Sequence, residues 1–201
     1  MDFTAIKANL EALGYKVSLF EGASDATKYL ASHIKNTTVG IGGSITAKQM
    51  GLGDVLAESN DVRWHWFPKE GQSAGDVLES AKYTEVYISS VNAIAETGEI
   101  VNIDGTGNRV ASTIYGHKKV YFVIGKNKIA KSEEQAIWRA RNIASPLNAR
   151  RLEKKTPCAV GEMKCHNCKS PQRICRSINV FWTKPGGCEY EIVLINEDLG
   201  Y

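Results

Sequence analysis

The residues that most clearly carry chemistry are cysteines grouped near the C-terminal end of the chain. Four of the five cysteines have the spacing C-x6-C-x2-C-x6-C; they are Cys158, Cys165, Cys168 and Cys175. Gly, Pro, Lys and Asn dominate between them, so residues 157–176 read as a loop with no apolar face of its own. A loop of this length is uncommon inside a compact domain unless something holds it. The spacing therefore predicts four thiolates that converge on one inorganic centre.

Three interpretations of this cysteine loop remain open. The first is an iron–sulfur centre with four thiolate ligands, a 4Fe-4S cluster. The second is a structural zinc site, for which the pair Cys165 and Cys168 is suitable. The third is two disulfides, or free thiols that merely lie close together. Zinc sites usually combine two C-x-x-C pairs, whereas this loop has one pair flanked by two distant single cysteines, so the spacing favours iron–sulfur. The fifth cysteine, Cys188, follows a Pro-Gly-Gly turn and is predicted to be structural.

A glycine-rich turn is the second candidate site. An apolar strand at residues 38–41 runs into Gly42, Gly43 and Ser44, and Thr46 follows where a helix is expected to begin. Backbone N–H groups freed by such a turn, together with the two hydroxyls, favour an anion such as phosphate or carboxylate. The residues match neither the Walker motif nor the dinucleotide-binding fingerprint. A tight strand-to-helix turn without a ligand is the alternative interpretation.

Polar residues after two later strands are expected to join this anionic pocket. Asn108 and Arg109 follow a glycine turn that begins at Asp104, and Lys128 lies in the polar loop after the apolar strand at 119–124. Ligands bind at the ends of strands in open α/β sheets. An arginine there can clamp a carboxylate or phosphate with two parallel hydrogen bonds. The alternative is a glycine turn with a surface arginine.

The pattern of elements predicts an α/β fold with an open, mostly parallel sheet, because strands and helices alternate over about 120 residues. Residues 62–67 alternate as one strand, and a helix is expected from Glu133 until Pro146 ends it. The last two strands, 179–182 and 189–195, are predicted to form a small antiparallel addition beside the cysteine loop. No linker divides the sequence, so residues 1–201 are expected to form a single domain.

Composition narrows the class of protein. The net charge of +3, with 23% charged residues, is too small to indicate a nucleic-acid-binding protein. No basic segment with an apolar core opens the chain, and no apolar run of about 18 residues is present, so neither a secretory signal nor a membrane span is expected. An odd number of clustered cysteines favours metal binding in a reducing cytosol over a secreted disulfide framework. A cytoplasmic location is therefore expected.

Six motifs resemble those of the lactate-utilisation (LUD) domain family, along nearly the whole chain. They are Val39-Gly40-Ile41-Gly42-Gly43-Ser44, Ala95-Glu96-Thr97-Gly98, Gly107-Asn108-Arg109-Val110, Gly125-Lys126-Asn127-Lys128-Ile129, Ser145-Pro146-Leu147-Asn148-Ala149-Arg150 and Val193-Leu194-Ile195-Asn196-Glu197-Asp198-Leu199-Gly200. The resemblance implies a sheet of the sugar-phosphate isomerase and coenzyme A transferase type. It also implies a link to bacterial oxidation of L-lactate, where such proteins accompany iron–sulfur partners. The cysteine loop resembles that of a subgroup with additional cysteines.

Three functions follow as hypotheses. The first is an iron–sulfur component of lactate or related 2-hydroxy-acid utilisation, acting in electron transfer or small-anion binding, with iron–sulfur oxidoreductase subunits as partners. The second is an isomerase or transferase for a phosphorylated or acyl substrate. In that hypothesis Glu96, which the resemblance places near a nucleophilic glutamate, or Asp104 acts as base or nucleophile, although the chain lacks an obvious second domain for coenzyme A. The third is a non-catalytic module in which a zinc-stapled loop forms a docking surface.

Overall fold

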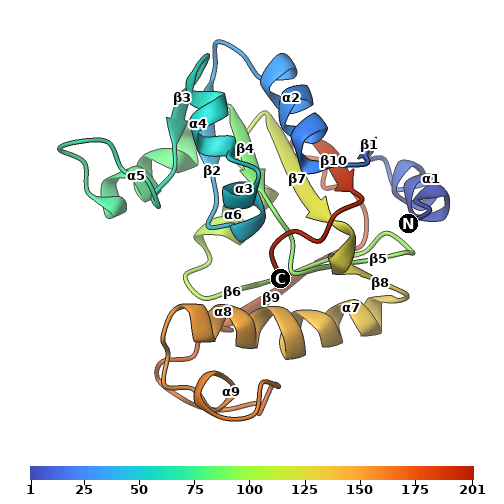
Figure 1. The fold of residues 1–201 in the computed structure, drawn as a ribbon, viewed down its shortest axis with the longest axis vertical. Helices are drawn as coiled ribbons and strands as arrows, with labels where there is room; N and C mark the ends of the chain where they lie inside the picture. Colours follow the sequence, from blue (N-terminus) through green and yellow to red (C-terminus); the bar gives the residue numbers. More distant parts are fainter.

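Two sheets form the frame of the protein, whose computed structural model describes all of residues 1–201 (Figure 1). The main sheet has six parallel strands in the order β1 (Lys16–Phe20), β10 (Glu189–Ile195), β7 (Lys119–Gly125), β4 (Val86–Ser89), β2 (Thr38–Ile41) and β3 (Asp61–Arg63). The small sheet has the order β8 (Ile129–Ala130), β5 (Ala93–Ala95), β6 (Ile100–Asp104) and β9 (Ser177–Phe181). In it β6 runs antiparallel to both neighbours, while β5 and β8 are parallel. The predicted α/β class with an open parallel sheet is confirmed.

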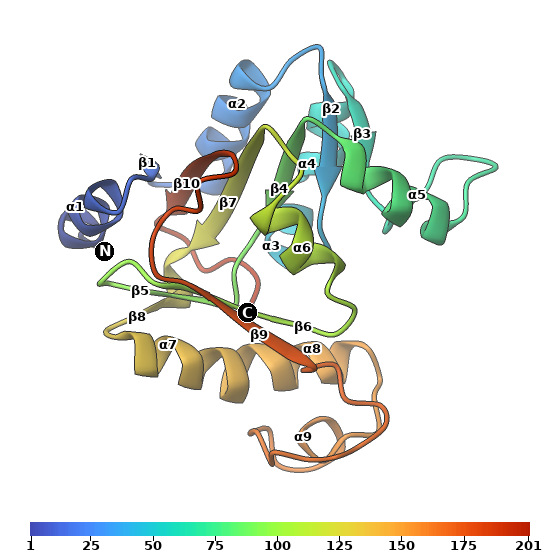
Figure 2. The same ribbon diagram turned by 180° about the vertical axis from the view of Figure 1, so that it is seen from behind.

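Helices and the small sheet enclose the main sheet in layers (Figure 1, Figure 2). One face packs against α2 (Ala23–His33), α3 (Ile45–Gln49) and α4 (Leu52–Ala57), and the other against α1 (Thr4–Ala12) and the small sheet. The outer face of the small sheet is covered by α7 (Glu133–Arg139) and the π-helical turn Ala140–Ala144, which continue into α8 (Ser145–Arg151). The remaining helices are α5 (Ala74–Ser80), α6 (Asn108–Ile114), α9 (Pro157–Val160) and the 3-10 turns Ala81–Tyr83 and Lys126–Lys128. None of these helices combines the length and the apolar character that a membrane crossing requires.

The central strands are apolar on both faces, which explains their place in the interior. In β7, Phe122 and Ile124 enter the core under α1, whereas Val123 enters the core under α2 and α4. In β10, Ile192 enters the core under α1, and Val193 enters the core under α2 and α4. Successive side chains point to opposite faces of a strand, so such a strand is stable only where both faces are covered.

The prediction that the last two strands pair with each other is wrong. β9 runs antiparallel beside β6, whereas β10 enters the main sheet between β1 and β7 and is parallel to both. Every residue of β10 after Glu189 is buried, so this strand needs partners on both edges and cover on both faces. The Lys-Pro-Gly-Gly segment is therefore a connection between two sheets and not a hairpin turn.

Two element boundaries also differ from the expectation. The strand predicted at 62–67 ends at Arg63, because Trp64 turns into the core beneath α4 and is 3% exposed. Pro146 does not end its helix, which continues to Arg151. The preceding turn is π-helical, so one extra residue widens the turn where proline lacks an N–H and where its ring would otherwise meet a carbonyl.

A buried carboxylate ties three strands of the main sheet together. Glu191 in β10 is fully buried, and its carboxylate accepts hydrogen bonds from Ser18 (2.8 Å) and Tyr29 (2.6 Å). Lys16 and Lys119 each pair with the carboxylate at 2.9 Å. Burial by itself would raise the pKa of Glu191, but these donors outweigh it and lower the pKa to about 2.

This network predicts a specific loss of stability in acid. A carboxyl group whose pKa is lower in the folded chain stabilises the fold above its unfolded pKa, near 4.5, and loses that contribution as the pH falls towards about 2. The contribution is on the order of 3 kcal/mol. Urea unfolding of the native chain between pH 2 and 7 should therefore show a slope that Glu191→Gln lacks. Glu189→Gln, at the exposed start of the same strand, is the matched control and should keep the slope. Parallel stability curves for the native chain and Glu191→Gln would contradict the assignment.

Candidate functional site

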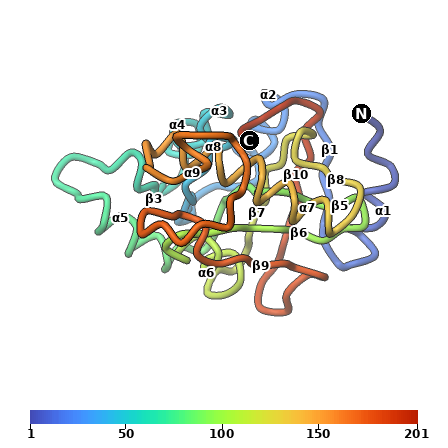
Figure 3. Tube along the Cα trace, turned by 90° about the horizontal axis from the view of Figure 1, so that it is seen from below, coloured from blue at the N-terminus to red at the C-terminus, as the bar shows by residue number.

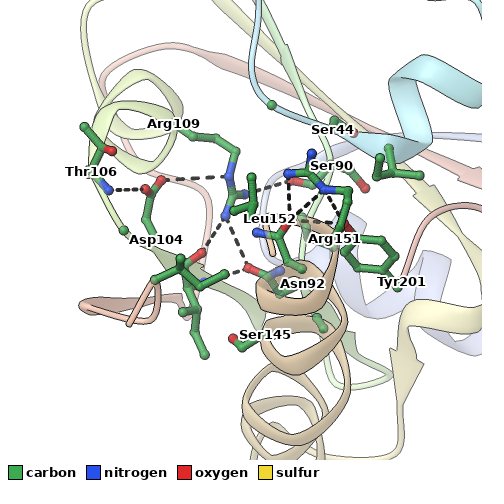
Figure 4. A pocket seen from close by; sticks show the side chains of 18 of the residues that line it. Ser44, Ser90, Asn92, Asp104, Thr106, Arg109, Ser145, Arg151, Leu152 and Tyr201 are labelled. Atoms are coloured by element: carbon green, nitrogen blue, oxygen red, sulfur yellow. Dashed lines mark hydrogen bonds and ion pairs between the residues drawn. The ribbon is translucent and has the colours of Figure 1, made fainter. Parts of the chain in front are cut away.

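A cavity of about 290 Å³ lies at the carboxyl ends of β2, β4 and β7 (Figure 4). Its other walls come from the start of α6, from α8 and from the C-terminal residue Tyr201. Five of the residues predicted to bind an anion line it: Gly43, Ser44, Asn108, Arg109 and Lys128. The structure therefore brings residues from three distant parts of the sequence to one cavity, which we call the strand-end pocket.

Gly42 and Thr46, also predicted to bind an anion, do not line the strand-end pocket but lie directly behind its wall. A Cβ at Gly42 would lie 2.9 Å from the Tyr87 hydroxyl and 3.1 Å from Cγ of Arg109, so glycine is required there by packing. Thr46 is fully buried, and its hydroxyl accepts a hydrogen bond from Nζ of Lys128 at 2.9 Å. The Ser44 hydroxyl caps α3 by accepting from the Ala47 N–H at 3.1 Å.

The guanidinium of Arg109 is bound by protein acceptors on both arms. Nη1 donates to the carbonyl of Ser90 (3.2 Å) and to Oδ1 of Asn102 (2.5 Å). Nη2 donates to the carbonyl of Ile103 (2.8 Å) and to Oδ1 of Asn92 (3.2 Å). Its donors are thus used to join the ends of β4 and β6, so Arg109 contributes positive charge to the strand-end pocket without a free fork for a ligand.

Asp104 is the only acidic side chain in the strand-end pocket, and it is also engaged. Its carboxylate accepts hydrogen bonds from the backbone N–H groups of Thr106 (3.1 Å), Gly107 (2.9 Å) and Val110 (3.1 Å), and lies 3.8 Å from Nε of Arg109. These bonds fix the turn before α6, where Gly107 has a φ of +89° that favours glycine. Asp104 therefore shapes the strand-end pocket.

Lys128 is a buried amine with no acidic partner. It is 3% exposed, and Nζ donates to the hydroxyls of Thr46 and Ser90, each at 2.9 Å. Burial is the main reason that its pKa falls to about 7, and the positive charges of Arg139 and Arg109 lower the pKa further. Its burial therefore disfavours the charged form of the amine.

Arg151 is a lining residue that sequence reasoning missed. It lies at the end of α8, where Nε donates to the Tyr201 hydroxyl (2.8 Å) and Nε and Nη2 donate to Oδ1 of Asn148 (3.0 and 2.8 Å). Its guanidinium lies 5.0 Å from the ring centroid of Trp66. Nη1 has no partner in the protein, so it is free to bind a ligand. With Arg109, two arginine side chains face one carboxylate, and the Lys128 amine adds a third positive charge when it is protonated, which makes the pocket suited to an anion.

The four cysteines of the C-terminal loop line a second cavity, which we call the cysteine cavity. Cys158 comes from α9, and Cys165, Cys168 and Cys175 come from the extended loop that runs beneath α8 (Figure 3). All four are free thiols. No three Cys, His, Asp or Glu side chains are spaced to hold a single metal ion as they stand. Cys188 does not line this cavity; it packs partly buried against the core under α1.

Hydrogen-bond donors surround the sulfur atoms of the cysteine cavity. Sγ of Cys165 accepts from the backbone N–H of Asn167 (3.4 Å) and from Arg141 (3.5 Å), and Sγ of Cys175 accepts from Arg173 (3.5 Å). Burial would raise the pKa of Cys165, but the Asn167 N–H and the Arg141 guanidinium outweigh it and lower the pKa. N–H donors on the sulfurs and two arginines beside them are the surroundings that an anionic iron–sulfur cluster requires, but the four thiols would have to draw closer together to hold one.

The two cavities share a wall. Ser145 at the start of α8 and Ile174 in the cysteine loop line both of them. The loop is also bonded to the strand-end pocket, since the N–H of Arg176 donates to the carbonyl of Asp104 at 2.9 Å. The backbone of Ile174 lies so close to Gly105 that a Cβ there would be 2.8 Å from the Ile174 carbonyl oxygen. The cysteine loop is therefore part of the strand-end pocket.

Glu96, the predicted catalytic residue, lies outside both cavities. It is in the turn between β5 and β6, and its carboxylate pairs with Nζ of Lys131 at 2.6 Å at the surface. Its backbone carbonyl accepts from the Asn9 side chain at 2.7 Å. The structure does not bring Glu96 to the glycine turn that was expected to hold its substrate, so its catalytic role stays a prediction.

Comparisons with known proteins are consistent with this fold. The sequence model of the LUD domain matches residues 4–195. The crystal structure of a DUF162 family protein from Deinococcus radiodurans superposes with a TM-score of 0.52, covering 97% of this chain and 99% of the other, at 11% sequence identity. At that identity the likeness concerns the fold alone. Among curated proteins, none matches the sequence.

Arg109→Lys is predicted to destabilise the protein by about 2–4 kcal/mol, because lysine cannot reach the acceptors on both arms and leaves buried oxygens unpaired. Urea unfolding at neutral pH measures the effect. Arg63→Lys is the control, since Arg63 pairs with the half-exposed Asp61 and such pairs contribute little. Equal losses for the two variants would contradict the structural role given to Arg109.

Proposed function

The chain belongs to the LUD domain family, which is associated with lactate utilisation, and on that premise we propose that it is an iron–sulfur component of the utilisation of lactate or a related 2-hydroxy acid. One observation carries the proposal: four free cysteines line one cavity that shares a wall with a cationic pocket. The cysteine cavity suits a redox centre, and the strand-end pocket suits a small carboxylate.

Cys158, Cys165, Cys168 and Cys175 would hold the cluster. When bound, a 4Fe-4S cluster supplies one-electron transfer, a chemistry that no side chain of the α/β body provides. Arg141 and Arg173 place positive charge beside the thiolates, which supports a group with net negative charge. The zinc interpretation remains the alternative for the same four ligands.

The strand-end pocket would bind the carboxylate of the substrate. Arg151 presents the unpartnered Nη1, Lys128 a buried amine and Ser44 a hydroxyl proton, while Arg109 adds positive charge from behind. Tyr201 and Asn148 hold the Arg151 guanidinium in place through Nε and Nη2. A three-carbon acid fills only part of 290 Å³, so the cavity leaves room for water or a second group beside it.

Metal analysis tests the cluster directly. Protein purified without oxygen should be brown, contain iron and acid-labile sulfide, and show a broad absorption near about 400 nm that dithionite bleaches. Serine at any one of Cys158, Cys165, Cys168 or Cys175 should lower the iron content, whereas Cys188→Ser, the matched control outside the cysteine cavity, should leave it unchanged. A colourless protein with stoichiometric zinc would overturn the iron–sulfur assignment and favour the structural-zinc module.

Binding of the acid is tested separately by calorimetry with L-lactate. Arg151→Ala should weaken binding by about tenfold or more, because it removes a charged donor worth about 1.5–3 kcal/mol. Lys154→Ala, just beyond the same helix and outside the strand-end pocket, should bind as the native chain does. Binding that is equal in all three proteins would place the carboxylate elsewhere.

The isomerase or transferase hypothesis has its own test. Glu96→Gln should abolish turnover of a phosphorylated or acyl substrate and leave the iron content unchanged, because Glu96 lies outside the cysteine cavity. Lys131→Gln, which removes the surface partner of Glu96, is the control for loss of the ion pair alone. Unchanged turnover in Glu96→Gln would exclude Glu96 as the base or nucleophile and count against that hypothesis.

A further inference from the structure

The amine of Lys128 has the surroundings of a nucleophile. It is 3% exposed, and its two hydrogen-bond partners are hydroxyls of Thr46 and Ser90. No carboxylate pairs with it, and the charges that act on it, on Arg139 and Arg109, are also positive. A buried ammonium in such a place is costly, so the neutral amine is favoured, and a neutral lysine amine attacks carbonyl carbon.

The position of Lys128 makes this amine available to a ligand. Lys128 and its partner Ser90 both line the strand-end pocket, beside Arg151 and Ser44. The product of amine attack on a carbonyl is an iminium, which is again a buried cation. The site therefore suits a carbonyl compound that brings its own negative charge next to the reacting carbon.

From this geometry we propose that Lys128 forms an imine with a small 2-oxo acid bound in the strand-end pocket. The inference deepens the proposed function, on which it rests for the choice of acid, since a 2-oxo acid is the oxidised partner of a 2-hydroxy acid. The carboxylate of the acid then lies one bond from the iminium carbon and supplies the counter-charge that the protein lacks.

The step balances without any other reactant. The nitrogen lone pair of the neutral amine attacks the C2 carbonyl carbon, an N–C bond forms, and the oxygen takes up the proton that nitrogen loses. Protonation of the resulting carbinolamine hydroxyl lets water leave, and the nitrogen lone pair forms the C=N bond. The net change is amine, 2-oxo acid and one proton giving iminium and one water. The hydroxyl oxygens of Thr46 and Ser90, each 2.9 Å from Nζ, accept hydrogen bonds from the amine and hold it in place for the attack, and the protons are exchanged with solvent through the pocket.

Reductive trapping tests the proposal. The native chain is incubated with pyruvate and cyanoborohydride, digested, and mapped by mass spectrometry. The expected result is a reduced pyruvate adduct on Lys128, and about tenfold less adduct with acetone, which lacks the carboxylate. Lys128→Met should lose the adduct, whereas Lys126→Met, two residues away in the same 3-10 turn, should keep it. No adduct in the native chain, or adducts spread over surface lysines, would overturn the proposal.

The outcome is separable from that of the proposed function. Failure to trap pyruvate in a chain that still binds L-lactate would refute the imine and leave the carboxylate pocket intact. Absence of both would refute the pocket as well, and the iron content decides the cluster independently. Because the adduct is located in the native chain, the conclusion holds even where Lys128→Met does not fold.

Discussion

The anchoring of the Arg109 guanidinium by four hydrogen bonds is the constraint on which the site depends. It joins the carbonyl ends of β4 and β6, and it lies beside Asp104, whose carboxylate fixes the turn before α6. The backbone carbonyl of Asp104 in turn receives the N–H of Arg176 at the end of the cysteine loop. Arg109 thus positions the floor of the strand-end pocket. Through Asp104 it also positions the loop that carries the cysteines. A charge that is largely removed from water, with the side chain 14% exposed, is tolerated because almost every donor has a partner.

The sequence predicted well what depends on local pattern. Continuous runs of apolar residues located the central strands, and the spacing of Cys158 to Cys175 identified four side chains that do line one cavity. Long-range pairing was beyond such patterns: the strand at 189–195 looks like half of a hairpin until its burial on both faces is seen. The role of Arg109 was likewise hidden, because its partners Asn92 and Asn102 are set by the fold. Arg151 gave no signal beyond a basic residue near a helix end.

The cysteine loop is held by polar contacts more than by a core. Ala159 is its only buried apolar residue, at 9% exposure, whereas Arg150 donates to the Ala159 and Gly161 carbonyls and Arg173 to that of Cys168. Exposed contacts of this kind contribute little each, so the loop by itself has a low local stability. A metal centre bound by all four cysteines would stabilise the loop, in which the sequence offers few apolar contacts. The scarcity of apolar residues in the loop is therefore consistent with a loop that is held by a bound metal centre.

Because Ile174 belongs to the loop and also to the wall of the strand-end pocket, the cysteine segment is not an interchangeable cassette. Excising it would open the flank of α8 to solvent and remove the N–H that anchors Asp104, so a chain without it must rebuild that side with other residues. Removing the thiols by excision and reshaping the strand-end pocket are therefore one and the same change. Transfer of the segment to an unrelated fold would carry the four cysteines but not the strand-end pocket that they adjoin.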